Sequence, residues 1–141
     1  MRIVLSLSVA VLLASCRAEP PVEALSAVVD RIAKERPHVC LALDGGDDLQ
    51  QALMSSIRPR HPHVFAASAC EPLPQMLYRT PDGRKAVRIE IYGWRRTSPW
   101  HARIEFYYDT NFMFGSASST FHLRLEGGKW KVAGESIHSI S

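Results

Sequence analysis

Residues 86–138 decide the fold, and they read AVRIEIYGWRRTSPWHARIEFYYDTNFMFGSASSTFHLRLEGGKWKVAGESIH. Apolar and polar side chains alternate through four segments of this stretch, 86–94, 101–109, 119–126 and 129–138. A period of two is typical of a strand that has one face on a core and the other in water. Glu126-Gly127-Gly128-Lys129 predicts a tight hairpin, because paired glycines readily adopt the positive φ of such turns. Thr97-Ser98-Pro99 predicts a second turn, so the stretch predicts a four-stranded antiparallel meander.

The water-facing side of this meander carries charges of both signs, and we expect ion pairs between neighbouring strands there. The residues expected on that face include Arg88, Glu90, Arg103, Glu105, Arg124 and Lys131.

The segment before the meander predicts a cover for its apolar face. Apolar residues at 25, 28, 29 and 32 form one stripe of a helix over residues 22–36, which Pro37 terminates. A second helix is expected over residues 47–58, where Asp47 and Gln50 have the spacing of a capping box. Residues 39–43 and 63–69 are candidate strands, and the proline-rich segment 71–85 is expected to be a loop.

These elements predict an α+β fold with the N-terminal helix, and a second short helix, packed on the four-stranded antiparallel meander. The chain has 141 residues, of which 46% are hydrophobic and 22% charged, as in ordinary globular proteins. We expect residues 22–141 to form one domain.

The first residues have a different composition. Arg2 precedes an uncharged apolar run over residues 3–13, which is too short to span a bilayer and typical of the core of a secretory leader. The run ends in Leu13-Ala14-Ser15-Cys16, which resembles the lipobox of bacterial lipoproteins. The resemblance implies that residues 1–15 are removed, that Cys16 carries the lipid, and that residues 16–21 form a tether. Arg17 resembles the following residue of lipoproteins sorted to the outer membrane, where the domain would face the periplasm. The alternative is a general secretory leader in which Cys16 is a coincidence.

The lipobox leaves Cys40 and Cys70 as a pair in an oxidising compartment, so we expect a disulfide between them. The alternative is two buried free thiols. A disulfide needs Cα atoms closer than about 7 Å, whereas parallel, in-register strands would hold these residues about 20 Å apart. The two candidate strands should therefore run antiparallel, or one of them is not a strand.

Chemistry-bearing residues are few and scattered. The net charge of +3 comes without a run of Lys or Arg, so no nucleic-acid partner is expected. His61 and His63, with His38, lack a recognisable third zinc ligand, and the acidic segment 44–48 lacks the ligand order of a calcium loop. We predict no cofactor and no metal.

Catalytic groups are also weakly indicated. No nucleophile motif surrounds the serines of the last strands, which are Ser119, Ser136 and Ser139. The titratable groups of the meander either are expected to face outward or have no recognisable catalytic partner in the sequence. They are Glu105, Asp109, His101, His122 and His138. We predict that the protein is not an enzyme.

An apolar cluster, Phe112-Met113-Phe114, interrupts the connection between the second and third strands, where polar residues are usual. Either it folds back on the core or it contacts a partner protein. Trp94 and Trp100, on either side of a turn, allow the same two interpretations.

The hairpin Leu123–Val132 resembles the last hairpin of nuclear-transport-factor-two-like and cystatin-like cones. The Val-Cys run, the later Ser-Ala-Cys at Ser68–Cys70 and the ending Ile140-Ser141 resemble small uncharacterised bacterial lipoproteins. The first resemblance implies a concave sheet that holds a small ligand. We therefore expect a lipid-anchored protein-binding domain of inhibitor, immunity or envelope-assembly type. A cone-shaped ligand-binding domain or enzyme, and a structural envelope component without a specific site, are the alternatives.

Overall fold

The computed structural model describes residues 19–44, 47–75, 77–110 and 115–140. Its elements in chain order are α2 (Val22–Glu35), β1 (Val39–Leu43), α3 (Asp47–Ile57), β2 (Val64–Ala66), the 3-10 turn η2 (Ala67–Ala69), β3 (Glu71–Leu73), β4 (Leu77–Arg79), β5 (Lys85–Ser98), β6 (His101–Thr110), β7 (Gly115–Glu126) and β8 (Lys129–Ile140).

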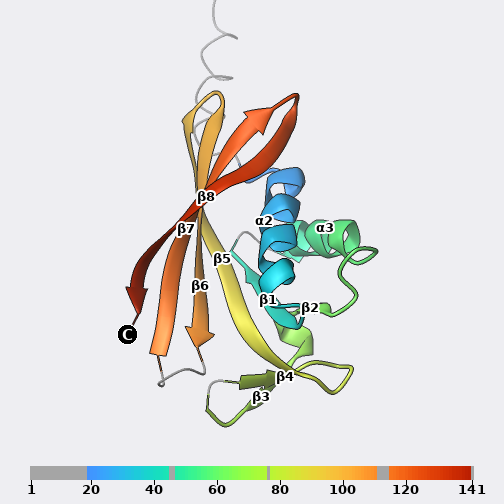
Figure 1. Ribbon diagram of the computed structural model, residues 1–141. Coiled ribbons are helices and arrows are strands. Elements are labelled where there is room, and N and C mark those ends of the chain that lie inside the picture. Colours follow the sequence, from blue (N-terminus) through green and yellow to red (C-terminus); the bar gives the residue numbers. More distant parts are fainter. Residues whose placement is uncertain (1–18, 45–46, 76, 111–114, 141) are drawn as a thin grey trace, which may run out of the picture.

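The sheet is mixed and has eight strands. Its main order is β2-β1-β5-β6-β7-β8, and the β3–β4 hairpin joins it through a pairing of β4 with β5. The α+β class is therefore confirmed, and the four-stranded meander undercounts the sheet. Figure 1 shows the four long strands twisting together, so that the β5–β6 and β7–β8 hairpins splay apart at one end.

The meander from β5 to β8 is antiparallel throughout, as its alternation predicts. Gly127 and Gly128 have φ of 58° and 77°, which is the conformation expected for a two-residue hairpin turn. The other predicted turn is displaced by one or two residues. Strand β5 continues to Ser98, which pairs with His101, so the chain turns at Pro99 and Trp100.

The pairing of the two shorter strands corrects the sequence prediction. Strand β1 runs parallel to β2 and to β5, with Cys40 opposite Phe65 and Arg88. The expectation of antiparallel strands was wrong because it extended the second strand to Ala69. Strand β2 stops at Ala66, and η2 then turns the chain so that Cys70 returns to Cys40.

The segment 71–85 is also more ordered than predicted. It contains the β3–β4 hairpin, in which Glu71 pairs with Arg79 and Leu73 with Leu77. Pro72 is tolerated because β3 is an edge strand, where a missing N–H does not interrupt a ladder.

Helix α2 lies on the sheet and supplies one side of the core (Figure 1). The buried residues of its stripe are Leu25, Val28, Val29 and Ile32. They join strand residues of the same cluster, including Ile89, Ile91, Ile104, Phe106, Phe121 and Leu123. Burying each such side chain stabilises the fold by about 1.5–3 kcal/mol before entropy is counted. Among the described residues, no helix has the length and apolarity needed to cross a membrane.

Helix α3 crosses from β1 to the parallel strand β2. Its buried face comprises Leu53, Met54 and Ile57. The Gln50 side chain, which the sequence places in a capping box, donates its amide to the carbonyl of Leu41 at 3.0 Å. That bond ties the helix to β1, and the hydroxyls of Ser26 and Ser56 join α2 to α3 at 3.0 Å.

Candidate functional site: a groove between helix α2 and the sheet

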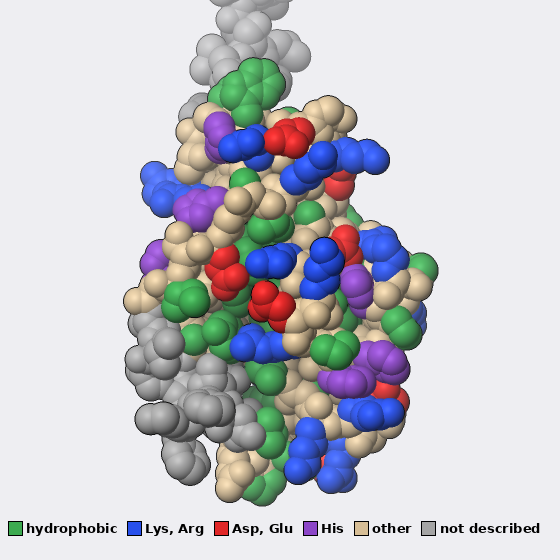
Figure 2. All heavy atoms as spheres, in the orientation of Figure 1, with side chains coloured by type: hydrophobic (Ala, Val, Ile, Leu, Met, Phe, Trp, Pro, Cys, Tyr) green, Lys and Arg blue, Asp and Glu red, His purple; other side chains and the backbone are tan. Residues whose placement is uncertain are grey.

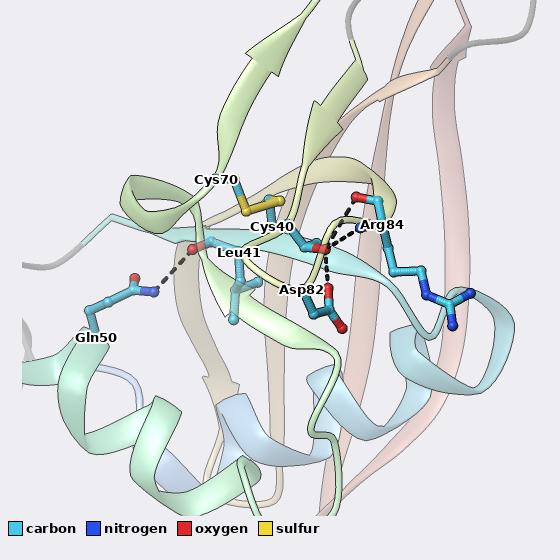
Figure 3. Close-up of a disulfide and its surroundings, with 7 residues drawn as sticks. Cys40, Leu41, Gln50, Cys70, Asp82 and Arg84 are labelled. Carbon is cyan, nitrogen blue, oxygen red and sulfur yellow. Dashed lines mark hydrogen bonds between the residues drawn. A yellow bond between two sulfur atoms is a disulfide. The ribbon is translucent and has the colours of Figure 1, made fainter.

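The disulfide joins Cys40 of β1 to Cys70, and the two Cα atoms lie 6.3 Å apart (Figure 3). Cys40 is fully buried. The bond lies between β1 and the turn η2, where the chain leaves the parallel strands for the β3–β4 hairpin. Its position indicates a structural staple.

A turn beside the disulfide contains Asp82, a carboxylate that contacts both Thr80 and His63. The hydroxyl of Thr80 donates to Asp82, and the backbone N–H of Arg84 donates to the same hydroxyl at 3.0 Å (Figure 3). The Thr80 hydrogen bond lowers the pKa of Asp82, and His63, whose Nδ1 lies 3.1 Å from the carboxylate, lowers it further. Asp82 is exposed, so this arrangement shapes a turn and does not form a dry acid–base site.

The three histidines considered as metal ligands have separate contacts. Nε2 of His61 lies 2.6 Å from Asp30, which also binds Arg60 at 3.2 Å. His63 contacts Asp82, and its ring lies 4.9 Å from that of His38. Within the described ranges, His, Cys, Asp and Glu form no group of three or more that could hold a metal ion.

The histidines of the meander pair with hydroxyls on the outer face of the sheet. His122 lies 2.9 Å from Ser136, His101 lies 2.8 Å from Ser98, and His138 contacts Thr120. Figure 2 shows histidines in two groups, one along the strands and one beside the helices. His101, His122 and His138 are exposed.

Tyr92 lies on the same outer face and pairs in register with Glu105. Burial raises the pKa of the Tyr92 hydroxyl, and the carboxylates of Glu105 and Glu90 raise it further.

The two tryptophans singled out from the sequence have different environments. Trp94 packs edge to face on Trp130, with ring centroids 5.6 Å apart, so it lies at the edge of the core. Trp100 is 62% exposed at the β5–β6 turn. Phe112, Met113 and Phe114 lie outside the described residues, as does Cys16.

A groove of about 260 Å³ lies between the C-terminal half of α2 and strands β6, β7 and β8. Its floor is aromatic. The rings of Phe106 and Phe121 stack at 4.4 Å, and Tyr108 stacks on Phe106 at 5.7 Å. Its walls are Arg31, Ile32, Glu35 and Arg36 on α2 and Glu135 and Ile137 on β8.

A bulge in β8 directs Glu135 and Ile137 toward the groove. Leu123 pairs with Val132 but His122 pairs with Gly134, so β8 has one extra residue. After this bulge, Glu135 lies opposite the buried Phe121, and Ile137 lies opposite the buried Ser119. Both side chains therefore share the inner face of the sheet.

Sequence reasoning missed these two residues because it treated 129–138 as one strand with an uninterrupted alternation, whereas the bulge changes which side chains face inward. Gly134 was the available indication, since a glycine inside a strand often marks a bulge.

The groove combines charged, aromatic and exposed apolar side chains. The Arg36 guanidinium lies over the Tyr108 ring, 4.4 Å from its centroid, and Arg31 pairs with Glu35 at 3.7 Å. Ile137 is 62% exposed beside a buried aromatic floor. Such a mixture of exposed apolar surface and aromatic and arginine side chains is typical of protein interfaces.

The other end of the space between α2 and the sheet is filled. A cavity of about 30 Å³ remains there, lined mainly by Leu25, Leu43, Ile91, Trp94 and Ile104. That volume has room for about one water. Under the N-terminal half of α2 the described residues therefore leave no room for the small ligand that the cone resemblance implies.

Comparisons of the chain with protein-family models, with curated proteins and with solved structures find no match.

Proposed function

We propose that this protein is a lipid-anchored, non-enzymatic envelope protein whose domain binds a partner protein in the groove between α2 and the sheet. The anchor is the lipid expected on Cys16, and outer-membrane attachment facing the periplasm is part of the proposal. The groove's exposed Ile137 beside its aromatic floor is the observation that carries the binding role.

The placement of the groove supports this role. The tether enters at the N-terminal end of α2, whereas the groove begins at Arg31, near the other end of the helix. Arg31 lies nine residues beyond Val22 along α2, or roughly 14 Å at 1.5 Å per residue. A groove this far from the anchor would remain open to a protein in the periplasm.

The apolar cluster 112–114 is adjacent in sequence to two strands that border the groove. Thr110 pairs with Gly115 as the last described pair of β6 and β7, and the cluster itself lies outside the described residues. We include Phe112, Met113 and Phe114 in the proposed contact surface. Trp94 is excluded from it because the ring is engaged with Trp130.

Site-specific photocrosslinking in the envelope tests the proposal. A photoreactive amino acid at Ile137 should give one discrete crosslinked protein, identified by mass spectrometry. The same group at Arg58, which is exposed in the turn directly after α3, is the matched control. The Phe112→Ser/Phe114→Ser variant should lose the Ile137 crosslink while retaining its thermal unfolding temperature. Equal crosslinking from both positions, or an Ile137 crosslink that survives the double substitution, would contradict a groove-centred partner site.

A further inference from the structure

The two splayed hairpins and the start of the folded chain lie at the same end of the molecule (Figure 1). Pro20 borders the small cavity beside Gly93 and Trp94. Val22 and Glu23 border a shallow hollow together with Lys129 and Lys131. We call residues 95–103 and 122–131 the hairpin end.

The hairpin end is strongly basic. Its charged residues, histidine aside, are Arg95, Arg96, Arg103, Arg124, Lys129 and Lys131 against the single acid Glu126. All six cations are exposed. Figure 2 shows a protruding hydrophobic side chain at this end with Lys and Arg side chains beside it, and further Lys and Arg side chains over the rest of the same face.

Like charges lie opposite one another on neighbouring strands here. Arg95 pairs in register with Arg103, and Arg124 pairs with Lys131. Glu126 contacts both Arg124 and Lys131, at 3.3 and 3.6 Å. In the part of the chain that the structure describes, the side chains of Arg95 and Arg103 have no ion pair or hydrogen bond. Opposed like charges destabilise a sheet unless an anion neutralises them, so this arrangement is suited to an external anion. Of the ion pairs expected between neighbouring strands, Lys131 forms one with Glu126, whereas Arg103 forms none with a described residue.

Trp100 projects from the tip of this basic surface. It is 62% exposed, although its backbone is fixed, since its carbonyl accepts the N–H of Leu125 at 2.7 Å. Arg96 braces the same turn by donating to the carbonyl of Pro99 at 3.1 Å. Tryptophan favours the water–lipid boundary because its ring is amphipathic. An exposed tryptophan surrounded by cations fits the headgroup layer of an anionic bilayer.

The short tether indicates that a bilayer is the anionic surface that the hairpin end contacts. From Cys16 to Pro20 is four residues, which span at most about 14 Å when fully extended. A lipid on Cys16 would therefore hold Pro20, which lies beside Gly93 and Trp94 at the base of the hairpin end, within about that distance of the membrane. We propose that the hairpin end is a second membrane contact, in which Arg95 and Arg103 bind anionic phospholipid headgroups and Trp100 enters the interface. This orientation rests on the proposed lipid anchor.

Vesicle binding by the unlipidated chain tests the surface without the anchor. All core residues lie between Ala24 and Trp130, so the chain 16–141 with Cys16→Ser retains the folded unit. It should sediment with vesicles of phosphatidylcholine and phosphatidylglycerol, and much less with phosphatidylcholine alone. Arg95→Glu/Arg103→Glu should weaken binding at least about tenfold, given the attraction of each cation to an anionic surface.

The matched control is Arg79→Glu/Lys85→Glu, which reverses an exposed cross-strand pair on β4 and β5, in the part of the sheet joined by the β3–β4 hairpin. This variant should bind as the parent does. The tryptophan emission of the parent should shift to the blue on vesicle binding, and Trp100→Phe should abolish the shift. Circular dichroism should be unchanged in every variant.

Three results would overturn the proposal: equal loss of binding in the two charge-reversed variants, no dependence on phosphatidylglycerol, or tighter binding to a soluble polyanion such as heparin than to vesicles. The last result would indicate a polyanion site instead. Palmitate labelling of the full chain tests the anchor separately. Labelling of Cys16 without vesicle binding would refute only the docking surface, and vesicle binding without labelling would refute only the anchor and the orientation derived from it.

Discussion

Loss of the Cys40–Cys70 disulfide should be the largest single covalent effect on the stability of this domain. The bond closes a loop with a sequence separation of 30, so the chain-entropy relation gives about 3–4 kcal/mol. A typical domain has about 5–15 kcal/mol of unfolding free energy in total. The Cys40→Ala/Cys70→Ala variant should therefore lose a large part of its stability, and its urea m-value should rise because the unfolded chain is less constrained.

The structure also predicts which strand removal of the disulfide destabilises most. Strand β2 has three residues, pairs only with β1 among the described strands, and leads directly into η2 and Cys70. Hydrogen exchange at Val64–Ala66 should accelerate in the variant more than exchange in β6, which is paired on both sides.

Urea unfolding of chain 16–141 carrying Cys16→Ser, followed by circular dichroism, measures the effect. The wild-type pair after reduction is the control, since it keeps both sulfur atoms and lacks only the bond. A difference of less than about 1 kcal/mol between oxidised and reduced protein would refute the loop-closure argument. Free thiols at both positions in oxidised protein, found by mass spectrometry, would refute the bond itself.

Three smaller effects follow from single residues. Gly93→Ala should lower the free energy of unfolding by about 1–3 kcal/mol, because φ at this position is +70° and an added Cβ would lie 2.8 Å from the Glu105 carboxylate. Gly134→Ala is the control: an added Cβ there meets open space, so the same urea titration should show almost no change. The hydrogen bond from the Thr80 hydroxyl lowers the pKa of Asp82, so the ionised Asp82 contributes to stability above the unfolded pKa of 3.8, and this contribution is lost as pH falls through the folded pKa. Asp82→Asn should therefore flatten the acid limb of a stability–pH curve. An unchanged acid limb would contradict this. Burial raises the pKa of Tyr92 above 10.0, so the contribution of the neutral Tyr92 to stability is present below that value and is lost as pH rises through the folded pKa. Tyr92→Phe should remove this high-pH phenol titration from the ultraviolet absorbance and flatten the alkaline limb of the stability–pH curve.

Local sequence patterns were sufficient to predict the fold wherever residues close together in sequence are also close together in space. The alternation in β5 to β8, the glycines at 127 and 128, and the stripe of α2 each follow from short-range rules of side-chain direction and turn geometry. The pairing of Cys40 with Cys70 was inferred from cysteine number and compartment, without knowledge of the chain path.

The candidate site was less accessible to sequence reasoning. Arg36 and Tyr108 are far apart in the chain and meet only because α2 lies across the sheet. Glu135 and Ile137 enter the groove through a bulge that reverses the inward and outward sides of β8. One inserted residue shifts the phase of a strand, and its position is set by pairing with β7.

The sequence by itself determined the meander, its tightest turn, the covering helix and the resemblance of the leader to a lipobox, because each depends on residues close together in the chain. Tertiary structure decided the parallel β1–β2 pairing, the β3–β4 hairpin, the groove and the clustering of Arg95, Arg103, Arg124 and Lys131 at one end. These features depend on strand register across the sheet, and register is fixed by packing between segments that the linear pattern cannot relate.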